Sequence, residues 1–383
     1  MEKRPLALAV FGTRPEAIKL APVIGALRAR PEMEVRVAAT GQHREMLDQV
    51  LAVFDLKPDY DLNLMQPGQE LSDLTGRILR EIQPLLLAEQ PRLLLVQGDT
   101  ATAFAAALAA FYRRIPVAHV EAGLRTGDKY SPWPEEINRR LVAVLADWHF
   151  APTKTAAANL RREGVPAARI HITGNTVIDA LLTVARPDYI FQSRPLAAWL
   201  AAAAAAGRRL LLATLHRREN WGPPLADICA GLRDILAEFP DVSLVLPLHK
   251  NPAARDVITA ALGAAAPPDR LYLCEPLFYA DFANLMGRAH LIVTDSGGVQ
   301  EEAPSLGKPL VVARDTTERP EIVARGGAML AGASGAAVRE AVRRLLTDEK
   351  FYARAAAAGN PYGDGRAAGR IAAVLAAVLG GTD

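Results

Sequence analysis

The chain has 383 residues, of which 50% are hydrophobic and 22% are charged, and its formal net charge is +2. This length predicts two domains, whereas so small a net charge argues against general binding to nucleic acids or other polyanions. Its two cysteines lack a paired spacing, no apolar stretch reaches membrane-spanning length and no signal peptide is recognisable, so we expect a cytoplasmic enzyme without disulfides, metal sites or membrane contacts.

Short apolar runs alternate with longer helical patterns, which predicts doubly wound parallel sheets. In the first half we expect strands at Leu6–Phe11, Val35–Thr40, Leu93–Gln97, Val117–Val120, His149–Ala151 and Ile170–Thr173. In the second half we expect strands at Leu210–Leu215, Val242–Leu246, Leu271–Cys274, Leu291–Thr294 and Leu310–Val312. An Ala-rich amphipathic helix is expected at Arg366–Leu379.

These patterns predict an α/β protein with two Rossmann-like domains facing each other. The N-terminal domain is expected at residues 1–185 and the C-terminal domain at residues 208–363, joined by a Pro- and Ala-rich linker region at residues 186–207. Ligands of such sheets bind at the carboxyl ends of the strands. We therefore expect the polar motifs that follow the strands to form the site.

A helix start follows the first expected strand. Thr13 and Glu16 have the spacing of a capping box, and Pro15 suits the first helical turn. Arg14 and Lys19 place two cations near this helix start, where the helix dipole disfavours them. The pattern therefore predicts an anionic ligand, although a capping box without these cations would indicate only a good helix start.

Acidic residues follow the next strands of the first half. Asp99 comes directly after the third expected strand, where it would otherwise serve as a helix cap. Glu121 ends a buried strand, an expensive place for an unpaired charge. Glu135 and Arg139 stand four residues apart at a helix start, which an exposed ion pair would also explain. A Pro-rich approach to this helix predicts an ordered loop leading into a site.

Histidines and arginines follow the strands of the second half. His216 and Arg217 come after its first expected strand, His249 comes after the next, and Arg319 follows the last. A lone histidine at a strand end is more often structural than catalytic. Two histidines and several arginines at neighbouring strand ends instead favour a site.

The segment Val293–Lys308 contains the most informative motif. It follows an apolar run, turns on Ser-Gly-Gly (residues 296–298) and enters a helix. Paired glycines let the backbone approach a ligand closely, and free N–H groups at a helix start attract anions. Glu301 and Glu302 suit sugar hydroxyls better than a bare anion. The motif therefore predicts a binding site for a diphosphate joined to a ribose. An isolated Ser-Gly-Gly turn would instead indicate an ordinary connection between a strand and a helix.

Together these motifs resemble those of the bacterial non-hydrolysing UDP-N-acetylglucosamine 2-epimerases. The matching blocks, which run along nearly the whole chain in the expected order, are residues 11–19, 42–50, 98–100, 119–125, 131–136, 172–180, 295–308, 314–321 and 360–365. The resemblance implies a glycosyltransferase-B type of fold, a last helix at residues 364–383 that crosses back to the N-terminal domain, and a homodimer. It also implies interconversion of UDP-N-acetylglucosamine (UDP-GlcNAc) and UDP-N-acetylmannosamine (UDP-ManNAc).

The C2 proton of such a sugar is not acidified by an adjacent carbonyl group. Two routes would nevertheless invert this carbon. Oxidation by a nicotinamide needs a dinucleotide site, and the sequence has no Gly-x-Gly-x-x-Gly turn, so we expect no cofactor. Elimination and re-addition of UDP through a glycal needs bases near C2 and positive charge around the diphosphate. The resemblance favours this second route.

By matching motif positions, the resemblance assigns Asp99, Glu121, Glu135 and His216 to catalysis. The carboxylates are expected to move protons at C2, His216 is expected at the diphosphate, and the face that each carboxylate serves stays open. The residues expected to bind substrate are Arg14, Lys19, Arg139, His249, Phe278, Ser296, Gly297, Gly298, Glu302 and Arg319. Carboxylates placed close together are also expected to raise one another's pKa toward neutrality.

The resemblance further implies an allosteric site. Many bacterial members bind a second UDP-GlcNAc next to the active site, and Gln42, Arg217 and His249 match residues used for that purpose. Glu45 and Gly68 stand where some members have Gln and Arg, which leaves the strength of activation open.

Three other functions stay open at this point. A glycosyltransferase of the same fold would also bind a nucleotide sugar, but it has less use for three carboxylates at the strand ends of the first domain. A hydrolysing epimerase would release free N-acetylmannosamine, so analysis of the product distinguishes it from a non-hydrolysing enzyme. A nucleotide-sugar sensor is disfavoured because it would not need intact acid–base residues.

Overall fold

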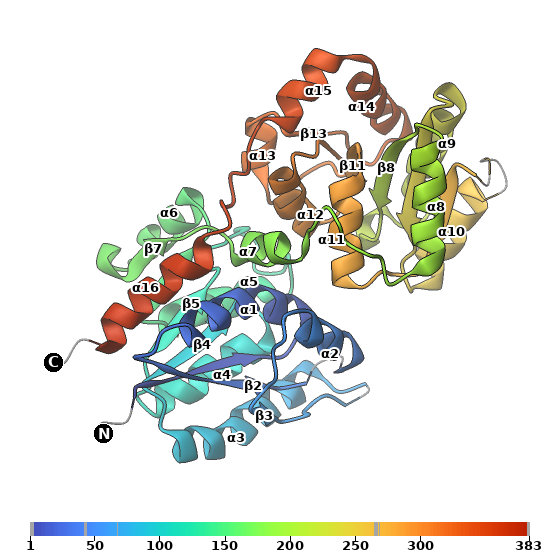
Figure 1. Cartoon of the computed structure of the whole chain (residues 1–383). Coiled ribbons are helices and arrows are strands. Elements are labelled where there is room, and N and C mark those ends of the chain that lie inside the picture. Colours follow the sequence, from blue (N-terminus) through green and yellow to red (C-terminus); the bar gives the residue numbers. More distant parts are fainter. Residues whose placement is uncertain (1–3, 42–43, 67, 264–266, 268, 381–383) are drawn as a thin grey trace. The chain divides into compact units, whose positions relative to one another are not determined.

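The computed structural model describes residues 4–41, 44–66, 68–263, 267 and 269–380 (Figure 1). The chain divides into two compact units. The first comprises Met1–Ala180 and Tyr362–Asp383, and the second comprises Leu181–Pro361. Each unit has a parallel sheet with helices between its strands, which confirms the expected α/β class with two Rossmann-like domains.

The first unit has a seven-stranded sheet in the order β3-β2-β1-β4-β5-β6-β7. Its strands are β1 (Leu6–Phe11), β2 (Glu34–Ala39), β3 (Tyr60–Asp61), β4 (Leu93–Gln97), β5 (Val117–Val120), β6 (Trp148–Ala151) and β7 (Ile170–Ile172). Every residue of β1, β4 and β5 is buried. Strands covered on both faces read as continuous apolar runs, which is why these strands were predicted with their observed bounds.

Helices connect these strands, and the last helix of the chain packs with them. The helices are α1 (Arg14–Arg28), α2 (Arg44–Val53), α3 (Leu71–Glu89), α4 (Ala101–Tyr112), α5 (Glu135–Leu145), α6 (Lys154–Arg162), α7 (Thr176–Val184) and α16 (Ala367–Gly380). Helix α16 contacts α1. Its first N–H groups donate to buried Asp179, from Ala367 at 3.2 Å and Ala368 at 2.9 Å. A carboxylate at this position satisfies N–H groups that have no partner within the helix.

The second unit has a six-stranded sheet in the order β10-β9-β8-β11-β12-β13. Its strands are β8 (Arg209–Thr214), β9 (Val242–Pro247), β10 (Leu271–Cys274), β11 (Leu291–Thr294), β12 (Leu310–Val312) and β13 (Ala328–Leu330). Its helices are α8 (Arg194–Ala205), α9 (Pro223–Glu238), α10 (Pro252–Leu262), α11 (Tyr279–Arg288), α12 (Gly297–Glu302), α13 (Pro320–Ala324), α14 (Gly335–Thr347) and α15 (Glu349–Ala356), with 3-10 turns η2 (Arg218–Asn220) and η3 (Ala303–Leu306).

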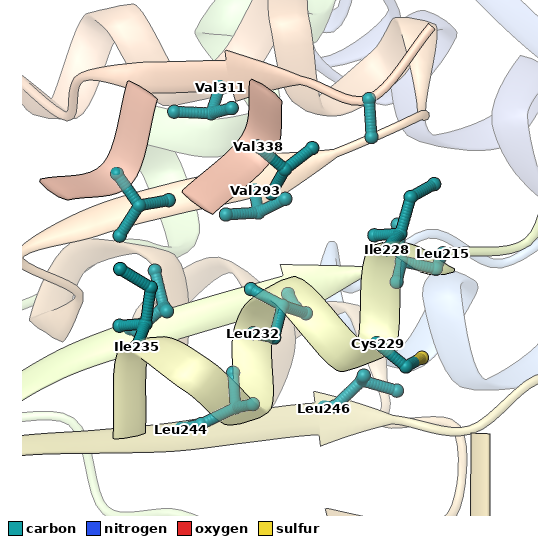
Figure 2. Close-up of a cluster of buried hydrophobic side chains, with 14 of the residues drawn as sticks. Leu215, Ile228, Cys229, Leu232, Ile235, Leu244, Leu246, Val293, Val311 and Val338 are labelled. Carbon is teal, nitrogen blue, oxygen red and sulfur yellow. The ribbon is translucent and has the colours of Figure 1, made fainter. Parts of the chain in front are cut away.

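The core of the second unit lies between this sheet and helices α9 and α14. Ile228, Leu232 and Ile235 of α9 face the strand residues Leu244 and Val293 (Figure 2). Close approach of the two helices requires glycine. A Cβ on Gly231 would lie 2.3 Å from the carbonyl oxygen of Gly335, and a Cβ on Gly335 would meet Asp227 at 2.0 Å.

The segment of residues 186–207 contains α8 and belongs to the second unit. Fully buried Asp281 of α11 holds its first part. The Asp281 carboxylate accepts from the Tyr189 hydroxyl at 2.7 Å and from the backbone N–H groups of Gln192 at 2.9 Å and Ser193 at 3.1 Å. Among the helices of the described ranges, none combines the length and apolar character needed to cross a bilayer.

Candidate functional site

Glu121 lies at the centre of a polar cluster in the first unit. It follows β5 directly, and its carboxylate accepts from Lys19 Nζ at 2.5 Å and from Asn175 Nδ2 at 2.9 Å. Gln97, the last residue of β4, donates to the other carboxylate oxygen. Because an ionised carboxylate only accepts hydrogen bonds, these donors fix its orientation and compensate its burial.

The backbone at Glu121 is left-handed, with φ of 64°. This conformation costs a non-glycine residue about 1–2 kcal/mol and persists where surrounding structure imposes it. Gly123 anchors the same turn, because a Cβ there would lie 2.3 Å from the carbonyl oxygen of Ala156. Asn159 donates to the Gly123 carbonyl at 2.9 Å. The turn is thus held from outside, and it presents the Glu121 carboxylate next to Lys19.

Asp99 follows β4 and forms an ion pair with Arg139 of α5. Burial raises the pKa of Asp99; Arg139 opposes this shift, and the charge of Glu121 adds to it. The prediction that neighbouring carboxylates raise one another's pKa therefore holds for Asp99, although burial is the larger cause. The cap of α4 is Thr100, whose hydroxyl accepts from Ala103 N at 3.0 Å. The alternative that Asp99 serves only as this cap is wrong.

Arg139 does not pair with Glu135, so the alternative of an exposed Glu135–Arg139 pair is also wrong. Arg139 instead contacts Asp99 and, at 3.5 Å, fully buried Glu136. Glu136 accepts from the backbone of Thr126 at 3.1 Å and so holds the loop that precedes α5. Glu135 lies at the first position of α5, partly buried, and its carboxylate makes no hydrogen bond or ion pair with the residues that the structure describes.

Glu16 closes the expected capping box at the start of α1. Its carboxylate accepts from the backbone N–H groups of Thr13 at 2.7 Å and Gly12 at 3.0 Å, and from the Thr100 hydroxyl at 2.8 Å. Glu16 thereby connects the helix start to the residue that follows Asp99. Burial raises the pKa of Glu16 from 4.5 to about 7, against the opposing effect of these hydrogen bonds.

This shift makes the stability of the protein depend on pH. The folded state favours protonated Glu16, so its contribution is complete below about pH 4.5 and is lost as the pH rises through about 7. The loss amounts to about 3 kcal/mol. In urea unfolding at pH 5 and pH 8, Glu16→Gln is expected to remove most of this loss, whereas Glu81→Gln, at an exposed position of α3, should not. An equal pH dependence in the wild type and Glu16→Gln would contradict the assignment.

In the second unit, fully buried Asp295 joins the ends of three strands. It follows β11 and accepts from the backbone N–H groups of His216 and Arg217, each at 2.9 Å, which come just after β8. Asn220 donates to Asp295 at 3.3 Å and to the Ala313 carbonyl, next to β12, at 3.0 Å. These contacts set the backbone position from which the His216 and Arg217 side chains project.

The His216 and His249 rings stack at 6.4 Å between centroids, with an interplanar angle of 15°. Burial lowers the pKa of His216, and Asp295, whose Oδ1 lies 3.4 Å from His216 Nδ1, opposes this shift. His249 Nδ1 accepts from the N–H group of Asn251 at 3.0 Å, so its proton is assigned to Nε2. The centroids of the Trp221 and His249 rings lie 6.0 Å apart, with an interplanar angle of 53°.

Two guanidinium groups flank the first residue of α12. A Cβ built on Gly297 would lie 3.5 Å from Arg319 Cζ and 3.7 Å from Arg217 Nη2. Arg319 is also held by Glu301, with 2.8 Å between Nε and Oε1. Cations at a helix start oppose the helix dipole, and the free N–H groups there add to the positive potential. The expected anion cradle therefore has two arginines beside its glycine turn.

The Glu302 side chain is buried close to the start of α11. Its Oε1 accepts from the Tyr279 hydroxyl at 2.9 Å, and Tyr279 is the first residue of α11. Phe278 precedes it and is 41% exposed. The structure thus brings Glu302 together with the segment that carries Phe278, and both were expected to bind substrate.

The chain matches the family model of UDP-N-acetylglucosamine 2-epimerase over residues 25–376. The chain belongs to this family. The 2-epimerase of Escherichia coli (strain K12) is 52% identical over 371 residues, which cover 96% of this chain and 97% of the relative. The expected resemblance is therefore confirmed.

Solved structures of this 2-epimerase family are also similar over nearly the full chain. The UDP-GlcNAc 2-epimerase from Neisseria meningitidis bound to UDP-GlcNAc is 45% identical, with a TM-score of 0.87 and coverage of 97% of this chain and 99% of that chain. The glycosyltransferase SnogD from Streptomyces nogalater, at 17% identity and a TM-score of 0.57, covers 98% of this chain and 100% of that chain. It shares the fold alone, which confirms the glycosyltransferase-B type.

In this member of the 2-epimerase family, the expected site residues are divided between the two units. The first unit contains Arg14, Lys19, Asp99, Glu121, Glu135 and Arg139. The second contains His216, Arg217, His249, Phe278, Ser296, Gly297, Gly298, Glu302 and Arg319. Gln42 lies outside the described residues. At Gly68 an added Cβ would meet nothing within 4 Å, although its φ of 70° disfavours a larger residue.

Several residues that build these groups were not predicted as site residues. Asp295 follows its strand just as Asp99 follows β4, so the same strand-end rule would have identified it. Gln97, at the end of β4, and Asn175 gave no comparable signal, since a neutral amide is common both at strand ends and in loops. Their contacts with Glu121 join segments 24 and 54 residues apart, which only the folded chain brings together.

Proposed function

We propose that this chain interconverts UDP-GlcNAc and UDP-ManNAc by inverting C2 through elimination and re-addition of UDP. The bound ligand of the Neisseria meningitidis relative supports the substrate. The arrangement of Glu121 carries the chemistry: a buried carboxylate held by Lys19 and Asn175, in a strained turn, with a second carboxylate at the neighbouring strand end. This placement suits proton transfer better than a structural ion pair.

The proposed reaction has two reversible steps. A carboxylate takes the C2 proton, the C2–H electron pair forms a C1=C2 double bond, and the C1–O bond breaks toward UDP. The resulting glycal is then protonated at C2 from the opposite face while UDP adds back to C1. Inversion thus needs both a proton acceptor and a proton donor.

The environments of Asp99 and Glu121 suit these two roles. Asp99, whose pKa is raised by burial, retains a proton more readily and suits the donor. Glu121, paired with Lys19, suits the acceptor, and the two exchange roles in the reverse direction. Glu135 is the third carboxylate proposed for this proton transfer, and its unengaged side chain leaves it available to the sugar.

The departing diphosphate needs positive charge. We assign this role to Arg319 and to the backbone of residues 296–298. His216 is also assigned to the diphosphate. Glu302 would accept the ribose hydroxyls, and Phe278 would contact uracil. A second nucleotide sugar at Gln42, Arg217 and His249, and a homodimeric assembly, stay predictions.

The test is incubation with UDP-GlcNAc in heavy water, with C2 followed by NMR. The proposal predicts UDP-ManNAc that carries deuterium at C2 and, at equilibrium, deuterium in both epimers. Product without deuterium would indicate internal proton return or hydride transfer and contradict exchange through a glycal. Net release of free N-acetylmannosamine would indicate a hydrolysing enzyme, and no turnover would favour a sensor or a transferase.

A further inference from the structure

A basic groove of about 390 Å³ lies at the amino-terminal edge of the second sheet. Its polar lining consists of Arg208, Arg209, Arg288, His290, Lys308 and Tyr352, and its other lining side chains are all leucine or alanine. We call it the Lys308 groove. No acidic residue lines it.

The cations of the Lys308 groove are not all neutralised. Arg208 pairs with Asp269 at 2.5 Å and Arg209 with Asp241 at 2.7 Å. By contrast, neither Lys308 nor Arg288 has a carboxylate partner among the residues that the structure describes.

Arg288 is exposed, and its guanidinium makes two contacts that are not with a carboxylate. Its guanidinium lies 5.0 Å from the centroid of the Phe191 ring and donates to the Tyr189 carbonyl at 3.3 Å. Contacts with an aromatic face and a carbonyl orient a cation without neutralising it. With Lys308, Arg288 therefore gives the groove two uncompensated positive charges.

Lys308 follows the η3 turn and is half-buried. Burial lowers the pKa of its ammonium group, with no opposing charge. Removing an ammonium from water without a partner costs free energy that a bound anion would recover.

His290 and Tyr352 form a rigid wall of the same groove. Their rings stack at 4.2 Å with an interplanar angle of 5°, and the Tyr352 hydroxyl donates to the His290 carbonyl at 3.0 Å. Burial lowers the pKa of His290 to about 4. The neutral imidazole offers polar contact without further charge.

We propose that the Lys308 groove binds a small phosphate-bearing anion of about the size of a diphosphate. The volume lies in the range of small-molecule sites, roughly 300–1,000 Å³. Strand β8 has six residues, so about 20 Å separates this edge of the sheet from the carboxyl ends of the strands. The groove is therefore separate from the nucleotide site proposed at Gly297, and its ligand binds whether or not UDP is present.

The test is calorimetric titration of pyrophosphate into the full-length protein saturated with UDP, which occupies the proposed nucleotide site. We expect one pyrophosphate per chain, with inorganic phosphate binding more weakly. Lys308→Met keeps the apolar stem and removes the charge, so Kd should rise about tenfold or more. Lys154→Met, at an exposed position of α6 in the first unit, is the matched control and should leave Kd unchanged.

No heat of pyrophosphate binding to the UDP-saturated protein would overturn the proposal, as would equal affinity of Lys308→Met and the wild type. Inorganic phosphate that binds as tightly as pyrophosphate would overturn the diphosphate assignment. If Lys308→Met failed to fold, Arg288→Gln would take its place with the same expected loss. Epimerase activity of Lys308→Met is expected to be unchanged. Pyrophosphate binding therefore tests the groove, and epimerase activity tests the proposed reaction independently.

Discussion

Replacing Glu121 with glutamine is expected to lower turnover of UDP-GlcNAc at least about a hundredfold, the size of a general acid–base contribution. The substitution is isosteric and removes the charge that Lys19 pairs with, so the base is lost while the turn is retained. Asp99→Asn should have a similar effect, because it removes the group whose raised pKa suits a proton donor. Initial rates at saturating substrate measure both losses.

The affinity for UDP distinguishes a variant that has lost only proton transfer from one whose structure is disrupted. Glu121 and Asp99 belong to the first unit, whereas the residues assigned to UDP belong to the second. Both variants should therefore bind UDP with near-native Kd in calorimetry. Glu81→Gln makes the same chemical change at an exposed position of the first unit and should leave turnover intact. A near-native rate in either Glu121→Gln or Asp99→Asn would show that its role in proton transfer is wrongly assigned.

Gly297→Ala is expected to weaken UDP binding about tenfold or more, since hydrogen bonds to charged groups contribute about 1.5–3 kcal/mol each. The added methyl would enter the space between the guanidinium groups of Arg319 and Arg217, at 3.5 and 3.7 Å. These are ordinary van der Waals contacts, so the fold tolerates the methyl, but it occupies the position assigned to a phosphate. Calorimetric titration with UDP measures the effect.

A glycine elsewhere in the same unit supplies the matched control. Gly287 lies in α11, and a Cβ there would meet nothing within 4 Å. Gly287→Ala should keep the wild-type UDP affinity, and both variants should unfold at or slightly above the wild-type temperature because alanine favours a helix. Wild-type affinity for UDP in a well-folded Gly297→Ala variant would contradict the assignment of the phosphate to this turn.

Most of the fold could be predicted because buried parallel strands leave a strong signal. The strands expected in both halves are all present, and their ends differ from the prediction by at most one residue. The two strands that were missed, β3 and β13, are short and lie at the edges of their sheets. Strand β3 has only two residues, one of them charged, and the apolar run of β13 has only three residues, of which Leu330 is exposed, so neither gives the signal of a buried strand.

The site was predictable in its residues but not in its pairings. Strand-end position pointed to Asp99 and Glu121, yet Arg139 pairs with Asp99 rather than with the glutamate four residues before it. Helix spacing describes neighbours on one helix, whereas this ion pair joins α5 to the end of β4. The raised pKa of Glu16 also depends on burial, which a capping-box pattern does not encode.

The left-handed turn at Glu121 has a practical consequence for engineering this protein. A thermostabilisation protocol that replaces non-glycine residues at positive φ would select position 121, where glycine relieves about 1–2 kcal/mol. Such a variant would lose the carboxylate on which the proposed chemistry depends, and it would leave Lys19, Asn175 and Gln97 without the acceptor that they share, which costs more than the backbone gains. Positive φ is therefore a misleading criterion for choosing positions to stabilise in this chain, and position 121 should be excluded from any such library.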